Sequence, residues 1–274
     1  MDIVVLSGKG GTGKTTVATN LSKVMSYAYV DCDVEEPNGY IFLKPEQSTA
    51  MDVTLNNPVI DSDKCVHCHA CVTSCEYNAL VGLLDKIILF EELCHGCGAC
   101  QLVCKTDAIT EIERPIGEIR ISERFAMGML NLKEPMGGPI ITELKKKTNH
   151  FNNRIIDAPP GTSCSVVKSV EESDFAILVT EPTTFGLHDL IKAIELIEMM
   201  KVPYGVIINR YDGYSFMDEY LEYKDILCLG KIPFSKSAAM LYSEGHLLIE
   251  DDSYKTCFVA MKKNLEALLE RRSS

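Results

Sequence analysis

The chain opens with MDIVVLSGKGGTGKTTVATN, residues 1–20, in which an apolar run leads directly into glycines and a lysine. Residues 8–15, GKGGTGKT, fit the pattern G-x-x-x-x-G-K-S/T between a strand-like run, IVVL, and a helix-like stretch, KTTVATNLSKVM. The glycines let backbone N–H groups turn toward phosphate oxygens, and the start of the helix adds partial positive charge. The opening therefore predicts a site for nucleotide phosphates; a glycine-rich turn without function is the alternative.

The side chains at the end of this loop suit phosphoryl transfer. Lys14 is expected to neutralise the β- and γ-phosphates, the Thr15 hydroxyl to hold Mg²⁺, and Thr16 to touch the α-phosphate. The nucleotide ligands expected in the loop are Gly8, Lys9, Gly10, Gly11, Thr12, Gly13, Lys14, Thr15 and Thr16.

Beyond the loop, short apolar runs alternate with amphipathic stretches such as FGLHDLIKAIELIEMM, residues 185–200. The strand-like runs are residues 3–6, 27–31, 154–157, 175–180, 204–209 and 226–232. This alternation predicts an α/β fold with a mostly parallel sheet flanked by helices. PIGEIRIS (115–122) and FAMGMLNL (125–132) predict two further strands, with a helix leading back to the strand at 154–157.

The last stretch of the chain, residues 255–272, has the period of an amphipathic helix. Its apolar face is formed by Phe258, Met261, Leu265, Leu268 and Leu269. This face lacks the aromatic content of a membrane-surface anchor, so we expect the helix to pack on the sheet.

Eight of the twelve cysteines lie between residues 57 and 113, where the alternation of strands and helices breaks. Residues 65–80 and 94–109 superpose at an offset of 29, and each contains C-x-x-C-x-x-C-x-x-x-C. With that spacing, three thiolates of one loop bind a 4Fe-4S cluster and the fourth binds the other cluster. The predicted ligands are Cys65, Cys68, Cys71 and Cys104 for cluster 1, and Cys94, Cys97, Cys100 and Cys75 for cluster 2.

This pattern resembles a bacterial two-cluster ferredoxin. The resemblance implies a small α+β domain at residues 57–113, inserted into a phosphate-loop domain formed by 1–56 and 114–274. The proline usual after each fourth cysteine is replaced by Glu76 and Lys105. That proline shapes the local turn and shields the cluster, so its replacement does not affect ligation. Zinc is the main alternative, but zinc sites use four ligands in two pairs.

Three histidines, His67, His69 and His95, lie among the cluster cysteines. We expect them to be solvated or to donate hydrogen bonds; a proton-coupled role is the alternative. Outside this region are Cys32, Cys164, Cys228 and Cys257, which we expect to be small buried apolar residues.

The charge balance limits the possible partners. Lys and Arg number 27 against 39 Asp and Glu, giving a net charge of -12, and no block of five basic residues occurs. A nucleic-acid partner is therefore disfavoured. No apolar run is long enough for a membrane span, and the first residues lack the basic segment of a secretory signal, so we expect a cytoplasmic protein without a stable membrane anchor. In the cytosol, twelve cysteines favour metal or redox chemistry over disulfides.

A second lysine in the loop, Lys9, gives KGGTGKT, and two aspartate elements follow: DCD at residues 31–33 and DAPPG at residues 157–161. Together these elements resemble the deviant Walker A ATPases related to MinD, ParA, Mrp and the nitrogenase iron protein, over residues 1–56 and 114–270. The resemblance implies ATP or ADP as the bound nucleotide and slow, partner-stimulated ATP hydrolysis.

The same resemblance implies roles for single residues. Lys9 is expected to reach across a dimer interface to the partner's nucleotide, Asp33 to orient the attacking water and Asp157 to bind the Mg²⁺ shell. The implied assembly is a nucleotide-dependent homodimer or a heterodimer with a paralogous ATPase. Asp31 is expected only to cap or brace a turn.

Adenine recognition is implied at the ends of two further strands. In this family a side-chain amide and backbone groups contact the base at positions that match Asn209, Ile232 and Pro233. For Asn209 the alternative is a turn residue after a strand. Cys164 lies just after the second aspartate element, where the nitrogenase iron protein carries a ligand of its subunit-bridging cluster. The second cysteine needed for such a bridge is absent, so we predict no third cluster.

Three functions fit the sequence. The first is an ATPase coupled to electron transfer through the two clusters, acting on an unidentified redox protein. The second is an ATP-dependent carrier or assembly factor that delivers iron-sulfur or other metal clusters to an accepting protein. The third is an intracellular positioning ATPase like MinD or ParA, with structural or redox-sensing clusters.

Overall fold

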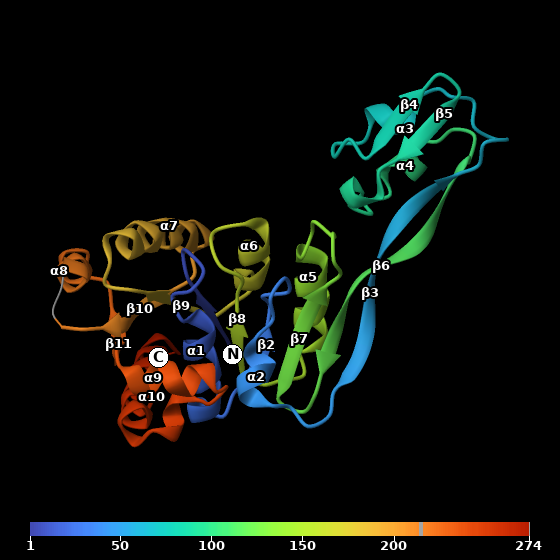
Figure 1. Ribbon diagram of the computed structural model, residues 1–274. Coiled ribbons are helices and arrows are strands. Elements are labelled where there is room, and N and C mark those ends of the chain that lie inside the picture. Colours follow the sequence, from blue (N-terminus) through green and yellow to red (C-terminus); the bar gives the residue numbers. More distant parts are fainter. Residues whose placement is uncertain (214–215, 274) are drawn as a thin grey trace.

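The computed structural model describes residues 1–213 and 216–273, and a nine-stranded sheet runs through this part of the chain (Figure 1). The strand order is β11-β10-β9-β1-β8-β2-β7-β6-β3. The strands are β1 (Asp2–Leu6), β2 (Ala28–Asp31), β3 (Thr49–Ile60), β6 (Ile109–Ile121), β7 (Phe125–Leu130), β8 (Arg154–Asp157), β9 (Phe175–Thr180), β10 (Tyr204–Tyr211) and β11 (Cys228–Pro233). From β11 to β7 all neighbours are parallel, whereas β6 and β3 are antiparallel to their neighbours. The predicted α/β fold with a mostly parallel sheet is confirmed.

Helices cover both faces of the sheet. They are α1 (Lys14–Met25), α2 (Gly39–Leu43), α5 (Gly138–Lys147), α6 (Cys164–Val170), α7 (Thr184–Met200), α8 (Phe216–Tyr223), α9 (Lys236–Ser243) and α10 (Asp252–Ser273), with a 3-10 turn η2 (Leu248–Glu250). Successive strand side chains point to opposite faces, so Val4 and Leu6 pack with α5 to α8, and Ile3 and Val5 pack with α1 and α10. Two buried cores result, one on each side of the sheet.

Helix α10 packs on the sheet as its periodicity predicts. Phe258, Met261 and Leu265 are buried, and Leu268 and Leu269 lie half-buried against the same core. Within the described residues, no helix combines the length and apolar character needed to cross a membrane.

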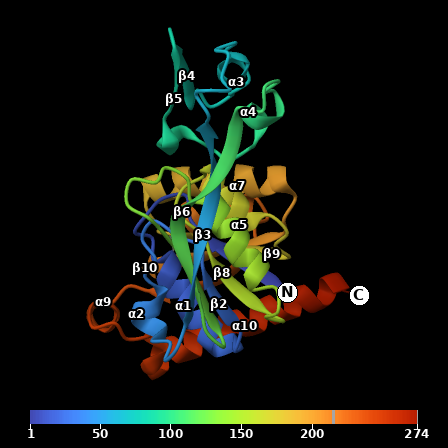
Figure 2. The same ribbon diagram turned by 90° about the vertical axis from the view of Figure 1, so that its right-hand side faces the viewer.

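Strands β3 and β6 form a long antiparallel ribbon that leaves the sheet. Their pairing runs from Thr49 opposite Ile121 to Ile60 opposite Ile109. Because β6 is antiparallel to β7, β3 points in the same direction as the parallel strands and carries the chain past their carboxyl ends. The cysteine-rich segment lies at the far end of this ribbon, apart from the main sheet (Figures 1 and 2). The ribbon runs unbroken through both of the domain boundaries that we predict from the sequence.

The cysteine-rich segment contains α3 (Ala70–Thr73), β4 (Leu80–Leu83), β5 (Lys86–Leu89), the 3-10 turn η1 (Glu91–Leu93) and α4 (Ala99–Leu102). Its two halves have matching backbones. Helices α3 and α4 begin 29 residues apart, and the Asp61 N–H donates to Ala108 O at 2.8 Å, as Phe90 N–H does to Ala79 O. Positive φ angles recur at the same offset, in the pairs His67 and Gly96, His69 and Gly98, and Asn78 and Asp107. The internal repeat predicted from the sequence is therefore confirmed.

Candidate functional site

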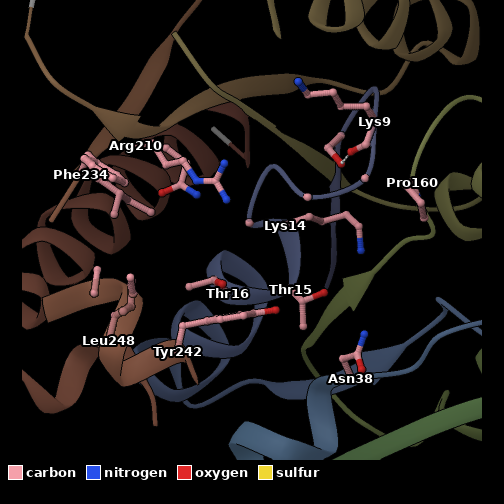
Figure 3. Close-up of a pocket in the computed structure, with 18 of the residues that line it drawn as sticks. Lys9, Lys14, Thr15, Thr16, Asn38, Pro160, Arg210, Phe234, Tyr242 and Leu248 are labelled. Atoms are coloured by element: carbon pink, nitrogen blue, oxygen red, sulfur yellow. Dashed lines mark hydrogen bonds between the residues drawn. The ribbon is translucent and has the colours of Figure 1, made fainter. Parts of the chain in front are cut away.

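The loop between β1 and α1 lines a cavity of about 450 Å³ at the carboxyl edge of the sheet (Figure 3). Gly11 and Gly13 have φ angles of 79° and 87°, a region that favours glycine. A Cβ on Gly8 would lie 2.2 Å from the Asp189 carbonyl oxygen of α7, so only glycine allows this close approach. The Thr12 hydroxyl is buried without a hydrogen-bond partner among the described residues. The loop's glycines thus fix a concave, donor-rich backbone of the kind that binds phosphate.

Most of the predicted nucleotide ligands meet in this cavity. The residues that we predict from the sequence and that line the cavity are Lys9, Gly10, Gly11, Gly13, Lys14, Thr15, Thr16, Asp33, Asn209, Ile232 and Pro233. Three predicted residues do not line the cavity: Gly8 and Thr12 of the loop, and Asp157. Sequence reasoning missed Asn38 and, at the end of the cavity near α9, Phe234, Tyr242 and Leu248. No motif marks these residues, although Phe234 follows directly after Pro233.

Lys14 lies among acidic side chains from two neighbouring strands. Its Nζ donates to Asp157 Oδ1 at 2.6 Å and is 3.8 Å from Asp33 Oδ2. Tyr29 was not singled out from the sequence. Its hydroxyl donates to Asp157 Oδ2 at 2.8 Å, and the hydroxyl oxygen lies 3.2 Å from Asp31 Oδ2. Asp31 also accepts the Gly39 N–H at 3.0 Å, which bears out its predicted bracing role. The two aspartate elements thus share one buried network.

Burial and charge shift the acid-base behaviour of this network. Burial, together with the nearby charge of Asp157, raises the pKa of Asp31 from 3.8 to about 7. Burial raises the pKa of Asp33 to about 6, although Lys14 opposes the rise. Burial alone would lower the pKa of Lys14, but Asp157 and the other carboxylates raise it above its ordinary value. Lys14 therefore stays positively charged, and a polyphosphate can compete with Asp157 for its ammonium group.

Two predicted ligands have distinctive positions. The Lys9 side chain extends from the outer side of the loop, away from Thr15 and Thr16 (Figure 3). The Asn209 side chain donates from Nδ2 to the Thr12 carbonyl at 2.7 Å, so it holds the phosphate loop while it lines the cavity.

The eight clustered cysteines divide between two small cavities in the cysteine-rich segment. One cavity is lined by Cys65, Cys68, Cys71 and Cys104. The other is lined by Cys75, Cys94, Cys97 and Cys100. These are the two crossed ligand sets predicted from the spacing, and each set brings together the four thiols that a 4Fe-4S cluster requires.

The surroundings of the two cavities are related but unequal. The Ala79 N–H donates to Cys75 Sγ and the Ala108 N–H to Cys104 Sγ, each at 3.3 Å. His95 stacks on Tyr77 beside the second cavity, with ring centroids 3.4 Å apart, whereas the first cavity has His69 in its wall. Within the described residues, no three His, Cys, Asp or Glu side chains converge on a position for a single metal ion.

The remaining cysteines differ in exposure. Cys32 is buried, and Cys228 and Cys257 are half-buried. Cys164 is exposed at the first position of α6, so the expectation of burial is wrong for this residue. Helix α6 begins beyond the second aspartate element and presents its first turn at the carboxyl edge of the sheet, where side chains remain accessible.

A phosphate loop at the carboxyl edge of a mostly parallel sheet, with acidic groups on neighbouring strands, defines a P-loop nucleotide-binding protein. The chain belongs to the family described as the CobQ/CobB/MinD/ParA nucleotide binding domain, which matches residues 3–249.

Relatives and solved structures agree with this family. Uncharacterized protein MJ0579 of Methanocaldococcus jannaschii is 33% identical over 91% of this chain and 92% of its own length. An iron-sulfur cluster carrier protein of Pyrococcus horikoshii is 24% identical over 96% of this chain and 84% of its own length. The structure of the septum site-determining protein MinD complexed with Mg-ADP, from Pyrococcus horikoshii, superposes with a TM-score of 0.61 at 18% identity, covering 98% of this chain and 96% of that one. This last likeness shows the fold.

Proposed function

We propose that this protein is an iron-sulfur ATPase that binds and hydrolyses MgATP as a dimeric switch, coupled to electron transfer through two 4Fe-4S clusters. The observation that carries the proposal is the division of eight cysteines into two cavities that match the crossed ligand sets of a two-cluster ferredoxin. The inserted domain at residues 57–113 is part of this proposal. A continuous ribbon joins it to the sheet that holds the phosphate loop.

The cysteine cavities fit clusters by donor chemistry. Cys65, Cys68, Cys71 and Cys104 would hold cluster 1, and Cys94, Cys97, Cys100 and Cys75 would hold cluster 2. A bound 4Fe-4S cluster supplies one-electron transfer. The backbone N–H groups of Ala79 and Ala108 donate to the sulfurs of Cys75 and Cys104, and the Ala108 donor lowers the pKa of the Cys104 thiol.

The phosphate loop provides the groups that hydrolysis needs. Incoming phosphates would draw Lys14 away from Asp157, since the lysine pairs with that carboxylate at 2.6 Å. Asp157 and the Thr15 hydroxyl would then be available for Mg²⁺. Asp33, at the edge of the cavity, would orient the attacking water. Asn209, Ile232 and Pro233 line the same cavity and are the proposed contacts to adenine.

A dimer would complete this site. Lys9 points away from Thr15 and Thr16, which leaves its amino group available to a nucleotide on a facing subunit. The facing subunit would be a second copy or a paralogue. Two relatives from Methanocaldococcus jannaschii, MJ0579 and MJ0578, are 33% and 32% identical to this chain, so one organism encodes more than one such protein. The acceptor or donor of electrons is an unidentified redox protein, and we place the protein in the cytoplasm.

A carrier or assembly factor for iron-sulfur clusters is the second candidate. Relatives named iron-sulfur cluster carrier protein and cytosolic Fe-S cluster assembly factor favour it. Ligation of each cluster by four cysteines from one chain favours resident redox centres over a cluster awaiting transfer. Incubation of the loaded protein with an apo-ferredoxin and MgATP separates the two: a carrier loses its iron to the acceptor, and a redox protein retains it.

The crossed ligation makes a sharp prediction for iron content. The anaerobically purified protein should bind about eight irons per chain, by the two-cluster ligand count. A Cys75→Ala and Cys94→Ala double variant removes two ligands of the same proposed cluster and should retain about four irons. A Cys75→Ala and Cys71→Ala variant removes one ligand from each cluster and should retain almost none. Equal iron losses in both double variants, or bound zinc without iron in the wild type, would overturn the assignment.

A further inference from the structure

The connection between β7 and α5, residues 131–137, touches the segments that follow both aspartate elements. Val34, directly after Asp33, is buried, and its carbonyl accepts the Leu130 N–H at 2.8 Å. A Cβ on Gly128 or Gly137 would lie 2.8 Å or 2.6 Å from Val34 methyl carbons, so Val34 fills space that these glycines leave. The same Cβ on Gly137 would be 3.4 Å from the Ser165 hydroxyl of α6. Gly137 therefore places this connection against both Val34 and the first turn of α6.

The same connection is tied to the base of the ribbon. The Asn131 N–H donates to Ile116 O at 2.9 Å, and the Asn131 side chain donates to Pro115 O at 3.2 Å. The Glu134 carboxylate pairs with Arg114 of β6, and both side chains are mostly buried. The Arg114 guanidinium donates directly to the Glu134 carboxylate, and such a charge-assisted hydrogen bond is stronger than one between neutral groups.

Arg114 also contacts the cysteine-rich segment, through Nη2 and Nε of its guanidinium group. Its Nη2 donates to Glu91 O at 3.3 Å, and its Nε lies 4.0 Å from Glu91 Oε2. Glu91 opens η1, which leads directly into Cys94. One guanidinium therefore bridges the nucleotide-binding domain and the loop that begins the second cysteine set.

We propose that Arg114 and Glu134 are positioning residues that transmit nucleotide state from the Asp33–Val34 segment and α6 to the Glu91–Cys94 segment at cluster 2. This inference rests on the proposed function, since it assumes that both sites are used. It assigns the coupling to cluster 2, because Arg114 contacts Glu91 of η1, which leads directly into Cys94. Neither Arg114 nor Glu134 lines the nucleotide cavity or a cysteine cavity.

The test is amide hydrogen exchange, read by mass spectrometry, on the cluster-loaded protein with MgADP and with a non-hydrolysable MgATP analogue. In the wild type, exchange in residues 91–98 should differ between the two nucleotides. Glu134→Leu should bind both nucleotides with wild-type affinity and lose that difference, while the difference in residues 33–38 remains. Glu134→Gln keeps an acceptor for Arg114 and should retain the response. Arg120→Gln is the matched control, because Arg120 pairs with Glu118 on the same strand at 2.7 Å.

The outcomes separate the inference from the function on which it rests. A response in residues 91–98 that survives Glu134→Leu, or that Arg120→Gln also abolishes, would overturn the assignment to this ion pair while leaving the coupling in place. A wild-type protein that binds both nucleotides without any difference in residues 91–98 would contradict the coupling itself.

Discussion

Tyr29 places one hydroxyl between the carboxylates of Asp31 and Asp157, at 3.2 and 2.8 Å. Asp157 also accepts from Lys14 Nζ at 2.6 Å, and Asp31 also accepts the Gly39 N–H at 3.0 Å. Burial and the charge of Asp157 nevertheless raise the pKa of Asp31 to about 7, so this carboxyl keeps a proton that an exposed aspartate would lose. Asp31 therefore changes its protonation state near neutral pH.

The pH dependence of stability follows from that shift. The unfolded Asp31 loses its proton near 3.8 and the folded one near 7, so between these values the folded state binds more protons and its stability falls as pH rises. Asp33, raised to about 6, acts in the same direction. Asp31→Asn has no such titration, so its stability relative to the wild type should improve between about pH 5 and about pH 8, measured by urea unfolding without nucleotide. A constant difference across this range would refute the assignment.

At the scale of elements, α5 holds the end of α6 through a buried lysine. Lys145 Nζ donates to the Ser169 carbonyl at 3.0 Å and also to the carbonyls of Lys168 and Glu171, where α6 has no backbone donors of its own. Since α6 follows the second aspartate element, this contact fixes the end of a segment that we expect to respond to nucleotide.

Lys145→Met should therefore lower the free energy of unfolding by about 2 kcal/mol, the cost of removing a charged donor from buried carbonyls. Lys146→Met, at the neighbouring exposed position, is the control and should change stability by less than about 0.5 kcal/mol. Chemical denaturation of both variants measures the contrast. Equal stabilities would show that Lys145 has no capping role.

The elements also show how far sequence patterns reach. The phosphate loop, the parallel strands and the two cysteine sets are predictable because each has a strict local spacing. Strand β3 was not predicted, although Met51, Val53 and Leu55 in its first half alternate with polar residues and pack against the core. In its second half only Asn57 and Pro58 are buried, so the apolar alternation does not continue there. Tyr29 looks like any buried residue of a strand, and its role becomes visible only when β2 and β8 lie side by side.

At the scale of the whole molecule, strand direction explains why one chain carries both kinds of site. The phosphate loop lies at the carboxyl edge of the parallel strands, and β3, running the same way, carries the cysteine-rich segment beyond that edge. A nucleotide-dependent movement at this edge would therefore occur at the root of the ribbon. Strands β3 and β6 pair from Thr49 to Ile60 with one register shift between Val53 and Thr54, so a paired ribbon, and not a single strand of chain, connects the two sites.

The central claim is that nucleotide state alters the clusters, and their midpoint potentials test it most directly. Potentials would be measured by anaerobic redox titration for the nucleotide-free, MgADP-bound and MgATP-bound protein, with Lys14→Ala as a variant deficient in phosphate binding. The account predicts that MgATP shifts the potential of one cluster by at least about 59 mV, a tenfold change in its one-electron equilibrium, and that Lys14→Ala abolishes the shift. Identical potentials in all three states of the wild type, with nucleotide binding verified, would contradict the account.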